Sequence, residues 1–475
     1  MRLAVVRQRY TPYGGAERFV EAALEALLER NVAISLYSRS WPDTKLQLIE
    51  PVICDPPYVG RLWRDWGFAR AVCRSLGKAQ ADLVQSHERL LCCDIYRAGD
   101  GVHATWLEQR ARVASRTARL ATAASPYHRY VLATERRLFT SSWLRAVICN
   151  SQMVKDEIRE RFGLAAERLH VIYNAVDSDA FHPGLRSLRG WVRERHHISD
   201  SATVFLLVGS GYQRKGVAAA IEAMSHLPPT AHLIVVGRER HLSRYAALAR
   251  ELGVHERVTL AGPQIEPKPF FGAADAFVLP TLYDPCPNAA LEAMACGLPV
   301  VTSTQSGAAE LVRAHDAGFV CDALDVAALA GHMTSLQDPA LRQRMGAAAR
   351  TGVAELTPAA MTLKLVLLYR DLLAAAAQAR ATPAAAVTEP MGAPGKPGTP
   401  AAAVPADDVP TALDPRTIAA SVEILPPPAL GDAAAELPMD ASAPEPPLLD
   451  RKARHDGGLP PELGDALAGR DPRAE

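Results

Sequence analysis

Short, uniformly apolar segments alternate with helical segments along most of this 475-residue chain, and this alternation limits the folds that it can adopt. Strands without polar alternate residues are typical of parallel sheets that helices cover on both faces. We expect strands in residues 3–6, 32–38, 81–87, 146–151, 169–174, 203–209, 231–238, 258–262, 276–280, 299–303 and 318–323. The sequence therefore predicts an α/β protein with two Rossmann-like domains that face each other across a cleft.

The pattern divides the chain into four parts. Residues 1–190 form the first predicted domain and residues 200–356 the second, and residues 357–380 read as one long helix that could pack on either domain. Residues 381–475 hold 18 of the 36 prolines, with long Ala/Pro stretches. Such a segment has too little apolar side chain to offset its ordering entropy, so we expect a disordered tail.

The formal net charge of zero conceals an uneven distribution. The tail carries 7 of the 52 basic and 15 of the 52 acidic residues, which leaves the body at about +8. A mildly basic body suits anionic partners such as nucleotides, phosphorylated glycans or an anionic membrane surface, and it does not single out nucleic acid. No apolar run is long enough to span a bilayer, and the N-terminus lacks a signal-peptide core, so we expect a cytoplasmic protein.

The eight cysteines show no C-x-x-C pair and no histidine spacing suited to zinc. Most of them lie in apolar runs such as "AVIC" and "FVCD", where cysteine behaves as a small core residue. We therefore expect neither a metal site nor a disulfide framework.

The stretch "YDPCPNAALEAMACGLPVV" places Asp284 and Glu292 on either side of a predicted helix start. Pro285 and Pro287 keep the chain extended, and Asn288 is a favoured N-cap. The start of a helix at the carboxyl edge of a parallel sheet binds phosphate, and the two acids can accept hydrogen bonds from sugar hydroxyls. The stretch is suited to a nucleotide-sugar, although acids near helix starts are also common caps.

Several motifs in order resemble a known family. These are "GGAE" near the N-terminus, "NAVD" at the junction of the domains, "RKG" in the second domain, and an acid followed after seven residues by another in "LEAMACGLPVV". Together they resemble the family 4 glycosyltransferases of GT-B fold. The stretches "GSGYQRKGV" and "DIYRAGDG" are most similar to those of enzymes that add glucose or another hexose to the lipopolysaccharide core.

The resemblance implies a retaining transfer from a nucleoside-diphosphate sugar, with UDP-glucose as the expected donor, a glycolipid acceptor, and no metal or other cofactor. It assigns the first domain to the acceptor and the second to the donor. By position, Glu292 would bind the ribose and Asp284 the donor hexose, while Lys215 and Arg214 would bind the diphosphate. Because Pro287 has no N–H, the backbone of Asn288 and Ala289 would donate to the phosphates.

The resemblance also points to residues in the first domain. Gly14 and Gly15 would let the backbone approach the phosphates or the acceptor, although a plain strand-to-helix turn would use them too. His103, with Asp100 three residues earlier, falls where the family often has a histidine near the donor sugar. A structural role for a single histidine is the alternative.

Residues 104–142 contain seven arginines, no lysine and two glutamates, and residues 61–76 alternate arginine with Trp63, Trp66 and Phe68. Arginine and tryptophan on one surface suit anionic headgroups, so we expect a peripheral protein on the inner face of the cytoplasmic membrane. A solvated basic helix is the alternative.

Three other functions fit the fold class. A dehydrogenase is disfavoured because Gly209-x-Gly211-x-x-Arg214 lacks the third glycine of the dinucleotide fingerprint. A GT-B sugar-nucleotide epimerase matches the motifs less well. A non-catalytic GT-B scaffold would keep the fold, but the intact Lys215 and Glu292 argue against it.

Overall fold

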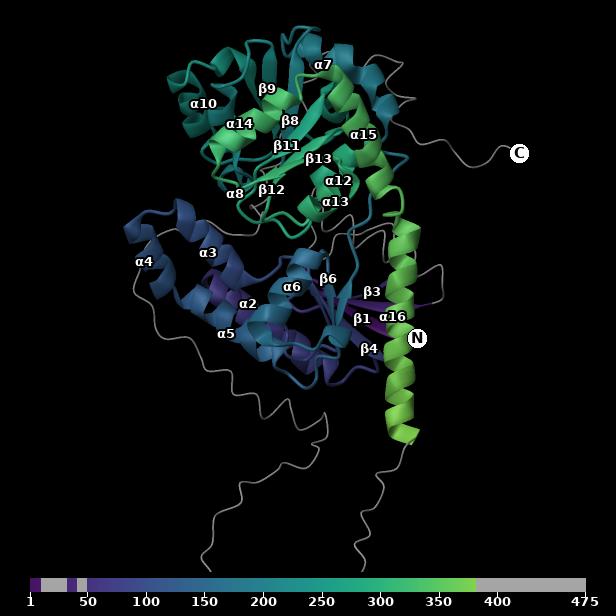
Figure 1. Ribbon diagram of the computed structural model, residues 1–475. Helices are drawn as coiled ribbons and strands as arrows, with labels where there is room; N and C mark the ends of the chain where they lie inside the picture. The colour runs from purple at the N-terminus through teal and green to yellow at the C-terminus, as the bar shows by residue number, and fades with distance from the viewer. Residues whose placement is uncertain (10–31, 41–48, 382–475) are drawn as a thin grey trace, which may run out of the picture.

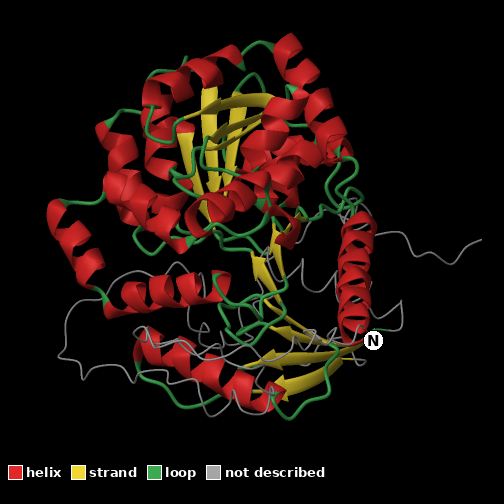
Figure 2. Ribbon diagram, turned by 60° about the horizontal axis from the view of Figure 1, so that its bottom comes forward, coloured by secondary structure: helices red, strands yellow, loops and turns green. Residues whose placement is uncertain are grey.

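The computed structural model describes residues 1–9, 32–40 and 49–381 (Figure 1). The predicted roles of Gly14 and Gly15 and the predicted tail from residue 382 onward fall outside these ranges. Within the described residues the chain forms two α/β domains, each built on one parallel sheet (Figure 2).

The first domain contains a seven-stranded sheet of order β3-β2-β1-β4-β5-β6-β7, in which every pair is parallel. Its strands are β1 (Arg2–Val6), β2 (Ala33–Ser38), β3 (Ile49–Ile53), β4 (Leu83–Ser86), β5 (Ile95–Ala98), β6 (Ala146–Cys149) and β7 (Leu169–Val171). Its helical elements are α2 (Gly60–Leu76), α3 (His103–Val113), α4 (Arg116–Ala124), α5 (Pro126–Phe139), α6 (Gln152–Phe162) and η1 (Ala166–Arg168).

The second domain contains a six-stranded parallel sheet of order β10-β9-β8-β11-β12-β13. Its strands are β8 (Thr203–Val208), β9 (Ala231–Val236), β10 (Val258–Gly262), β11 (Ala276–Leu279), β12 (Val300–Ser303) and β13 (Gly318–Cys321). Its helical elements are η2 (Pro183–Leu188), α7 (Arg189–Arg195), α8 (Tyr212–Lys215), α9 (Val217–Met224), α10 (Leu242–Glu251), η3 (His255–Arg257), α11 (Lys268–Ala273), α12 (Asn288–Ala295), α13 (Ala308–His315), α14 (Val326–Ser335) and α15 (Pro339–Val353).

The most apolar strands lie inside the second domain, where both faces of the sheet are covered. All six residues of β9 are buried, as are five of the six in β8. This is the arrangement that uniformly apolar segments predict for a parallel sheet. The predicted α/β fold class is confirmed. The structure has two strands that the sequence did not predict, β3 and β5, because proline or polar residues weaken the strand pattern there.

The chain crosses between the domains earlier than the predicted boundary at residues 190–200. Phe181, Leu185, Leu188 and Val192 are all buried in the core of the second domain. Arg193 is also buried there, where it donates to Asp275 at 2.8 Å. The crossover therefore lies before residue 181, because these apolar side chains bury against the second sheet.

The chain returns after α15 to the first domain as α16 (Pro358–Ala381), the long green helix beside the first domain in Figure 1. Met361, Leu365, Leu368 and Tyr369 of α16 join the core cluster formed by β1, β2 and their neighbours. The two crossings touch, because Val176 N–H donates to Leu356 O at 2.8 Å. Within the described ranges, no helix has both the length and the apolar character needed to cross a membrane.

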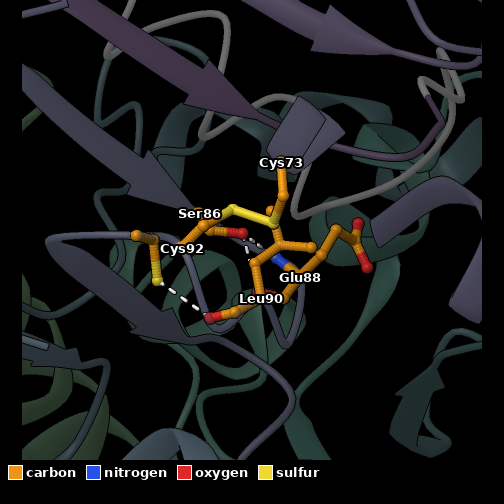
Figure 3. Close-up of a disulfide and its surroundings, with 6 residues drawn as sticks. Cys73, Ser86, Glu88, Leu90 and Cys92 are labelled. Carbon is orange, nitrogen blue, oxygen red and sulfur yellow. Dashed lines mark hydrogen bonds between the residues drawn. A yellow bond between two sulfur atoms is a disulfide. The ribbon is translucent and has the colours of Figure 1, made fainter. Parts of the chain in front are cut away.

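The cysteine prediction is right for six residues and wrong for two. Cys54, Cys93, Cys149, Cys286, Cys296 and Cys321 are buried free thiols. Cys73 on α2 and Cys92 before β5 form a disulfide across a Cα–Cα distance of 5.9 Å (Figure 3). Sequence spacing missed this pair because the two residues are 19 positions apart and meet only when α2 packs beside the β4–β5 connection.

Candidate functional site

Lys215, Arg214 and Asp284 meet at the carboxyl edge of the second sheet. Lys215 Nζ lies 2.5 Å from Asp284 Oδ2, and Arg214 Nη1 lies 3.3 Å from the same oxygen. Lys215 ends α8, which follows β8, and Asp284 lies in the loop after β11, residues 280–287, which we call the Asp284 loop. The structure therefore brings together residues that the sequence places 69 positions apart.

The backbone around Gly216 holds α8 close to the Asp284 loop. Gly216 has φ +73°, and a Cβ there would lie 1.9 Å from Pro280 O, so only glycine fits between α8 and the Asp284 loop. Leu282 N–H donates to Arg214 O at 2.8 Å, and Thr281 Oγ1 donates to the same oxygen at 2.9 Å. These contacts hold the "RKG" turn against the loop.

Lys215 and Asp284 are both buried, with 8% and 6% of their surfaces exposed. Burial lowers the pKa of Lys215, and the adjacent Asp284 opposes this shift. Burial would raise the pKa of Asp284, but Lys215 and Arg214 outweigh it and hold that pKa below its usual value. The result is a buried ion pair in which Lys215 and Arg214 share one carboxylate. One net positive charge remains, so an added phosphate would meet cations already largely removed from water.

Helix α12 begins shortly after Asp284, and its N-cap lies one residue earlier than predicted. Pro287 is the N-cap and Asn288 is the first helical residue, because the Asn288 side chain bonds to another residue instead of capping the helix. Ala290 N–H donates to Pro287 O at 3.0 Å, which is the first backbone hydrogen bond of the helix. The N–H groups of Asn288 and Ala289 come before it in the chain. Glu292 lies in the second turn of α12 and is 7% exposed.

Asn174 links the start of α12 to the first domain, a role that the sequence did not predict. Its amide donates to Asn288 Oδ1 at 2.6 Å and to Cys286 O at 3.2 Å. Its own oxygen accepts from Arg97 on β5 at 2.5 Å. The signal in the sequence was the "NAVD" motif at the junction of the domains. Asp177 does form a local turn, because Oδ1 accepts the N–H groups of Asp179 and Ala180.

His103 opens α3 and is 2% exposed. Its Nε2 lies 3.0 Å from His128 Nδ1, and its N–H donates to Glu135 at 3.0 Å. Burial, together with Arg89 and His128, lowers the pKa of His103 to about 2, so its ring is neutral at ordinary pH. Among the described residues its Nδ1 has no hydrogen-bond partner.

The predicted site residues are therefore distributed over two places in the described chain. Lys215, Arg214 and Asp284 contact one another, whereas the recorded partners of His103 lie in its own domain. Asp100 is exposed in the turn just before α3. Gly14 and Gly15 lie outside the described residues.

The domains meet around the Asp284 loop. Leu282, Tyr283 and Ala323 of the second domain form one buried cluster with Trp106 of α3. Arg112 also forms an ion pair with Asp322 at 2.8 Å. Helix α3, which begins at His103, and the Asp284 loop are therefore neighbours, even though the side chains of His103 and Asp284 belong to separate networks.

Glu310 on α13 also joins the two domains. Its carboxylate accepts the N–H groups of Gln152 and Met153, at 2.8 and 3.1 Å, and so caps the start of α6 in the first domain. Its two oxygens therefore satisfy backbone donors of a helix in the other domain.

The described residues contain no group of three or more His, Cys, Asp or Glu side chains that could hold a metal ion. The positive charge of the site comes instead from Lys215 and Arg214. Independence from metals remains a prediction.

Comparison with known proteins adds to this geometry. Residues 13–180 match the family model Glycosyltransferase Family 4, and residues 192–352 match Glycosyl transferases group 1. The lipopolysaccharide glucosyltransferase WaaG of Escherichia coli K12 is 24% identical over 328 residues, which are 67% of this chain and 85% of that protein.

Solved structures share the fold, and the following two are among them. A crystal structure of WaaG, described as a glycosyltransferase involved in lipopolysaccharide biosynthesis, has a TM-score of 0.66 and 22% identity over 76% of this chain and 98% of that one. Anabaena HepE in complex with UDP-glucose has a TM-score of 0.59 and 19% identity over 79% of this chain and all of that one.

Proposed function

This chain belongs to the glycosyltransferases of GT-B fold, and on that basis we propose that it transfers a hexose from a nucleoside-diphosphate sugar to a lipopolysaccharide-core or similar glycolipid. The proposed transfer retains the anomeric configuration. The observation that carries this proposal is the buried pair of Lys215 and Asp284, with Arg214 beside it and α12 beginning next to it.

Lys215 and Arg214 bind the diphosphate in this proposal. When the glycosidic bond to the donor breaks, negative charge grows on the leaving nucleoside diphosphate. Cations fixed in a buried site stabilise this charge more in the transition state than in the ground state, and so they accelerate the reaction. They also supply the charge neutralisation for which a metal would otherwise be needed.

Asp284, Glu292 and the start of α12 bind the rest of the donor. The diphosphate competes with Asp284 for the two cations, so the Asp284 carboxylate becomes free to accept hydrogen bonds from hexose hydroxyls. The N–H groups of Asn288 and Ala289 and the helix dipole attract the phosphates. Glu292, in the second turn of α12, binds ribose hydroxyls.

The donor that we propose is UDP-glucose. Two observations support it: the first relative is named a lipopolysaccharide glucosyltransferase, and one structural neighbour was solved with UDP-glucose. Asp284 is shorter by one methylene than the glutamate that is usual in the family, so the donor hexose is the part of this proposal that a screen must test first.

His103 faces the hexose in this proposal. Its Nδ1 is buried and has no partner among the described residues, and its ring stays neutral, so it is available for a hydrogen bond with a sugar hydroxyl. Asp100 lies in the adjoining turn, and Gly14 and Gly15 serve the phosphates or the acceptor.

We propose that the first domain meets an anionic membrane from the cytoplasmic side. Helix α4 projects from this domain in Figure 1, has no buried residue, and exposes 72% of Leu120. Trp63 on α2 is 45% exposed, and α2 and α4 both pack against α5. Exposed apolar side chains among arginines are what a headgroup region attracts.

A donor screen tests the proposed transfer. The protein is incubated with truncated core lipid and UDP-glucose, UDP-galactose, UDP-N-acetylglucosamine or GDP-mannose, and nucleotide release and glycolipid product are measured. We expect one donor, UDP-glucose, to give lipid-dependent turnover, and Lys215→Ala to lose most of it while remaining folded. Turnover that persists in Lys215→Ala would show that the site is assigned wrongly.

The configuration of the product tests retention. The anomeric coupling constant of the transferred hexose, measured by NMR, is expected to match that of the donor. An inverted configuration would contradict the proposed stereochemistry and leave the other assignments standing.

A further inference from the structure

Tyr283, in the Asp284 loop, has a side chain that reaches a backbone amide of the first domain. Its hydroxyl oxygen accepts the N–H of Val102 at 2.8 Å, and its hydroxyl donates to Glu157 Oε2 on α6 at 2.7 Å. The side chain is 2% exposed. A single buried hydroxyl therefore joins the second domain to two elements of the first.

Gly101 leaves room for the Tyr283 hydroxyl beside Val102. Gly101 has φ +70°, and a Cβ there would lie 2.1 Å from the Tyr283 hydroxyl, so any other residue would displace the tyrosine. The ring packs with Leu282 and with Trp106 of α3 in a small apolar cluster between the domains. Packing and hydrogen bonds thus fix the same position.

The hydrogen bond between Tyr283 and Val102 matters because of the residues that follow each of them in the chain. Asp284, which follows Tyr283, pairs with Lys215, and His103, which follows Val102, begins α3. We propose that Tyr283 is a positioning residue that sets the Asp284 loop and the His103 segment in their working relation across the two domains. This proposal rests on the proposed function, in which Asp284 and His103 bind the same hexose from opposite sides.

Glu157 orients the hydroxyl. Burial raises the pKa of Glu157 to about 7, although the hydrogen bond from Tyr283 and the charge of Arg161 oppose the shift. The other charged group that faces it is Glu108 on α3. When ionised, Glu157 can only accept, so the Tyr283 proton points toward it and the hydroxyl oxygen is left to accept from Val102. When protonated, Glu157 can donate and compete with Val102 for that oxygen.

The test compares four proteins: wild type, Tyr283→Phe, Glu157→Gln and Tyr369→Phe. Tyr369 is a matched control, because its buried hydroxyl donates to Gln85 at 2.7 Å and its loss removes one hydrogen bond away from the Asp284 loop. Tyr283→Phe keeps the ring and its packing, so it should fold.

We expect Tyr283→Phe to lower kcat by about tenfold or more, since misplacing reacting groups by a fraction of an ångström is costly. The donor KM should change by less than about threefold, because Tyr283 touches no part of the donor in the proposed site. Tyr369→Phe should keep kcat within about twofold. A Tyr283→Phe enzyme as fast as wild type, or an equal loss in Tyr369→Phe, would overturn the proposal.

The pH profile separates positioning from simple stabilisation. In wild type, turnover should fall as pH drops through about 7, as Glu157 takes up a proton. Glu157→Gln keeps an acceptor oxygen but does not titrate, so its profile should lack this step. A step that survives in Glu157→Gln would contradict the role given to Glu157.

Hydrogen exchange keeps this test separate from that of the proposed function. If wild type transfers no sugar from any donor, the proposed function fails, and the contact can still be measured. Exchange of the Val102 amide should be at least about tenfold faster in Tyr283→Phe than in wild type or Tyr369→Phe, because its acceptor is gone. Equal exchange in all three would overturn the contact itself.

Discussion

Lys215 and Asp284 illustrate how a buried charge at a proposed binding site differs from one in a core. A buried ion pair recovers its desolvation cost only through close geometry, and breaking it by removing one partner is strongly destabilising. Here one carboxylate is shared by Lys215 and Arg214 at 2.5 and 3.3 Å. Such a pair keeps two cations in place for an anionic ligand, which can then replace the carboxylate as their partner.

His103 gives a prediction at the same scale. Its pKa is lowered to about 2 by burial, with Arg89 and His128 contributing, whereas in the unfolded chain it is near 6.5. Below pH 6.5 the unfolded chain therefore binds a proton at His103 that the folded chain does not. The free energy of unfolding should fall as pH drops from 6.5 toward 4, by up to about 1.4 kcal/mol per pH unit from this residue.

Urea unfolding at pH 7.5 and 5.5 measures this contribution. His103→Gln should show a shallower loss of stability between the two pH values than wild type. His226→Gln, which changes an exposed histidine, serves as the control and should keep the wild-type slope. Equal slopes in all three proteins would mean that His103 accepts a proton in the folded state.

Helix α16 shows what is predictable at the scale of an element and what is not. The sequence predicts a helix over residues 357–380, and the structure has one at Pro358–Ala381. Its apolar face could pack against either sheet, because an amphipathic pattern specifies a buried face but not the surface that covers it. The choice is made by tertiary contacts: Leu365 and Tyr369 join the core of the first domain.

Two leucines of α16 test this placement. Leu365 is 1% exposed and Leu363 is 49% exposed, although they lie two residues apart on one helix. Leu365→Ala should lower the free energy of unfolding by about 2–5 kcal/mol, as deletions in packed cores do, while Leu363→Ala should cost less than about 1 kcal/mol. Thermal or chemical unfolding of both variants measures the difference. Similar losses in the two would contradict the packing of α16 on the first domain.

The site could be predicted from the sequence only where residues act through motifs. The acid pair of Asp284 and Glu292 drew attention to a helix start after a parallel strand, and the resemblance to a known family added "RKG". The structure brings Asp284, Lys215 and Arg214 together. Asn174 and Tyr283 were not predicted as links between the domains. Their roles depend on which loops meet when two separately folded domains come together, and no local pattern encodes that.

At the scale of the whole molecule, the arginines of the first domain should govern membrane binding. We expect the protein to bind vesicles that contain anionic lipid, to bind less as salt increases, and to bind neutral vesicles weakly, because the attraction is electrostatic and screened. Replacing Arg116 and Arg119 on α4 with serine should weaken binding. Replacing Arg244 and Arg250 on α10 of the other domain should not.

Sedimentation with vesicles of each composition measures this binding. Equal binding to neutral and anionic vesicles, or equal losses from the two pairs of substitutions, would contradict the proposed membrane surface. Absence of binding in low salt would contradict it as well.

The central claim is that Lys215, beside Asp284 and the start of α12, holds the diphosphate of a sugar nucleotide. Isothermal titration of UDP into wild type, Lys215→Met and Lys364→Met tests it most directly. Lys364 is an exposed lysine of α16, so its variant controls for the loss of one positive charge. We predict that wild type and Lys364→Met bind UDP equally, and that Lys215→Met binds at least about tenfold more weakly, a loss of about 1.4 kcal/mol or more. A folded Lys215→Met protein that binds UDP as tightly as wild type would contradict the claim.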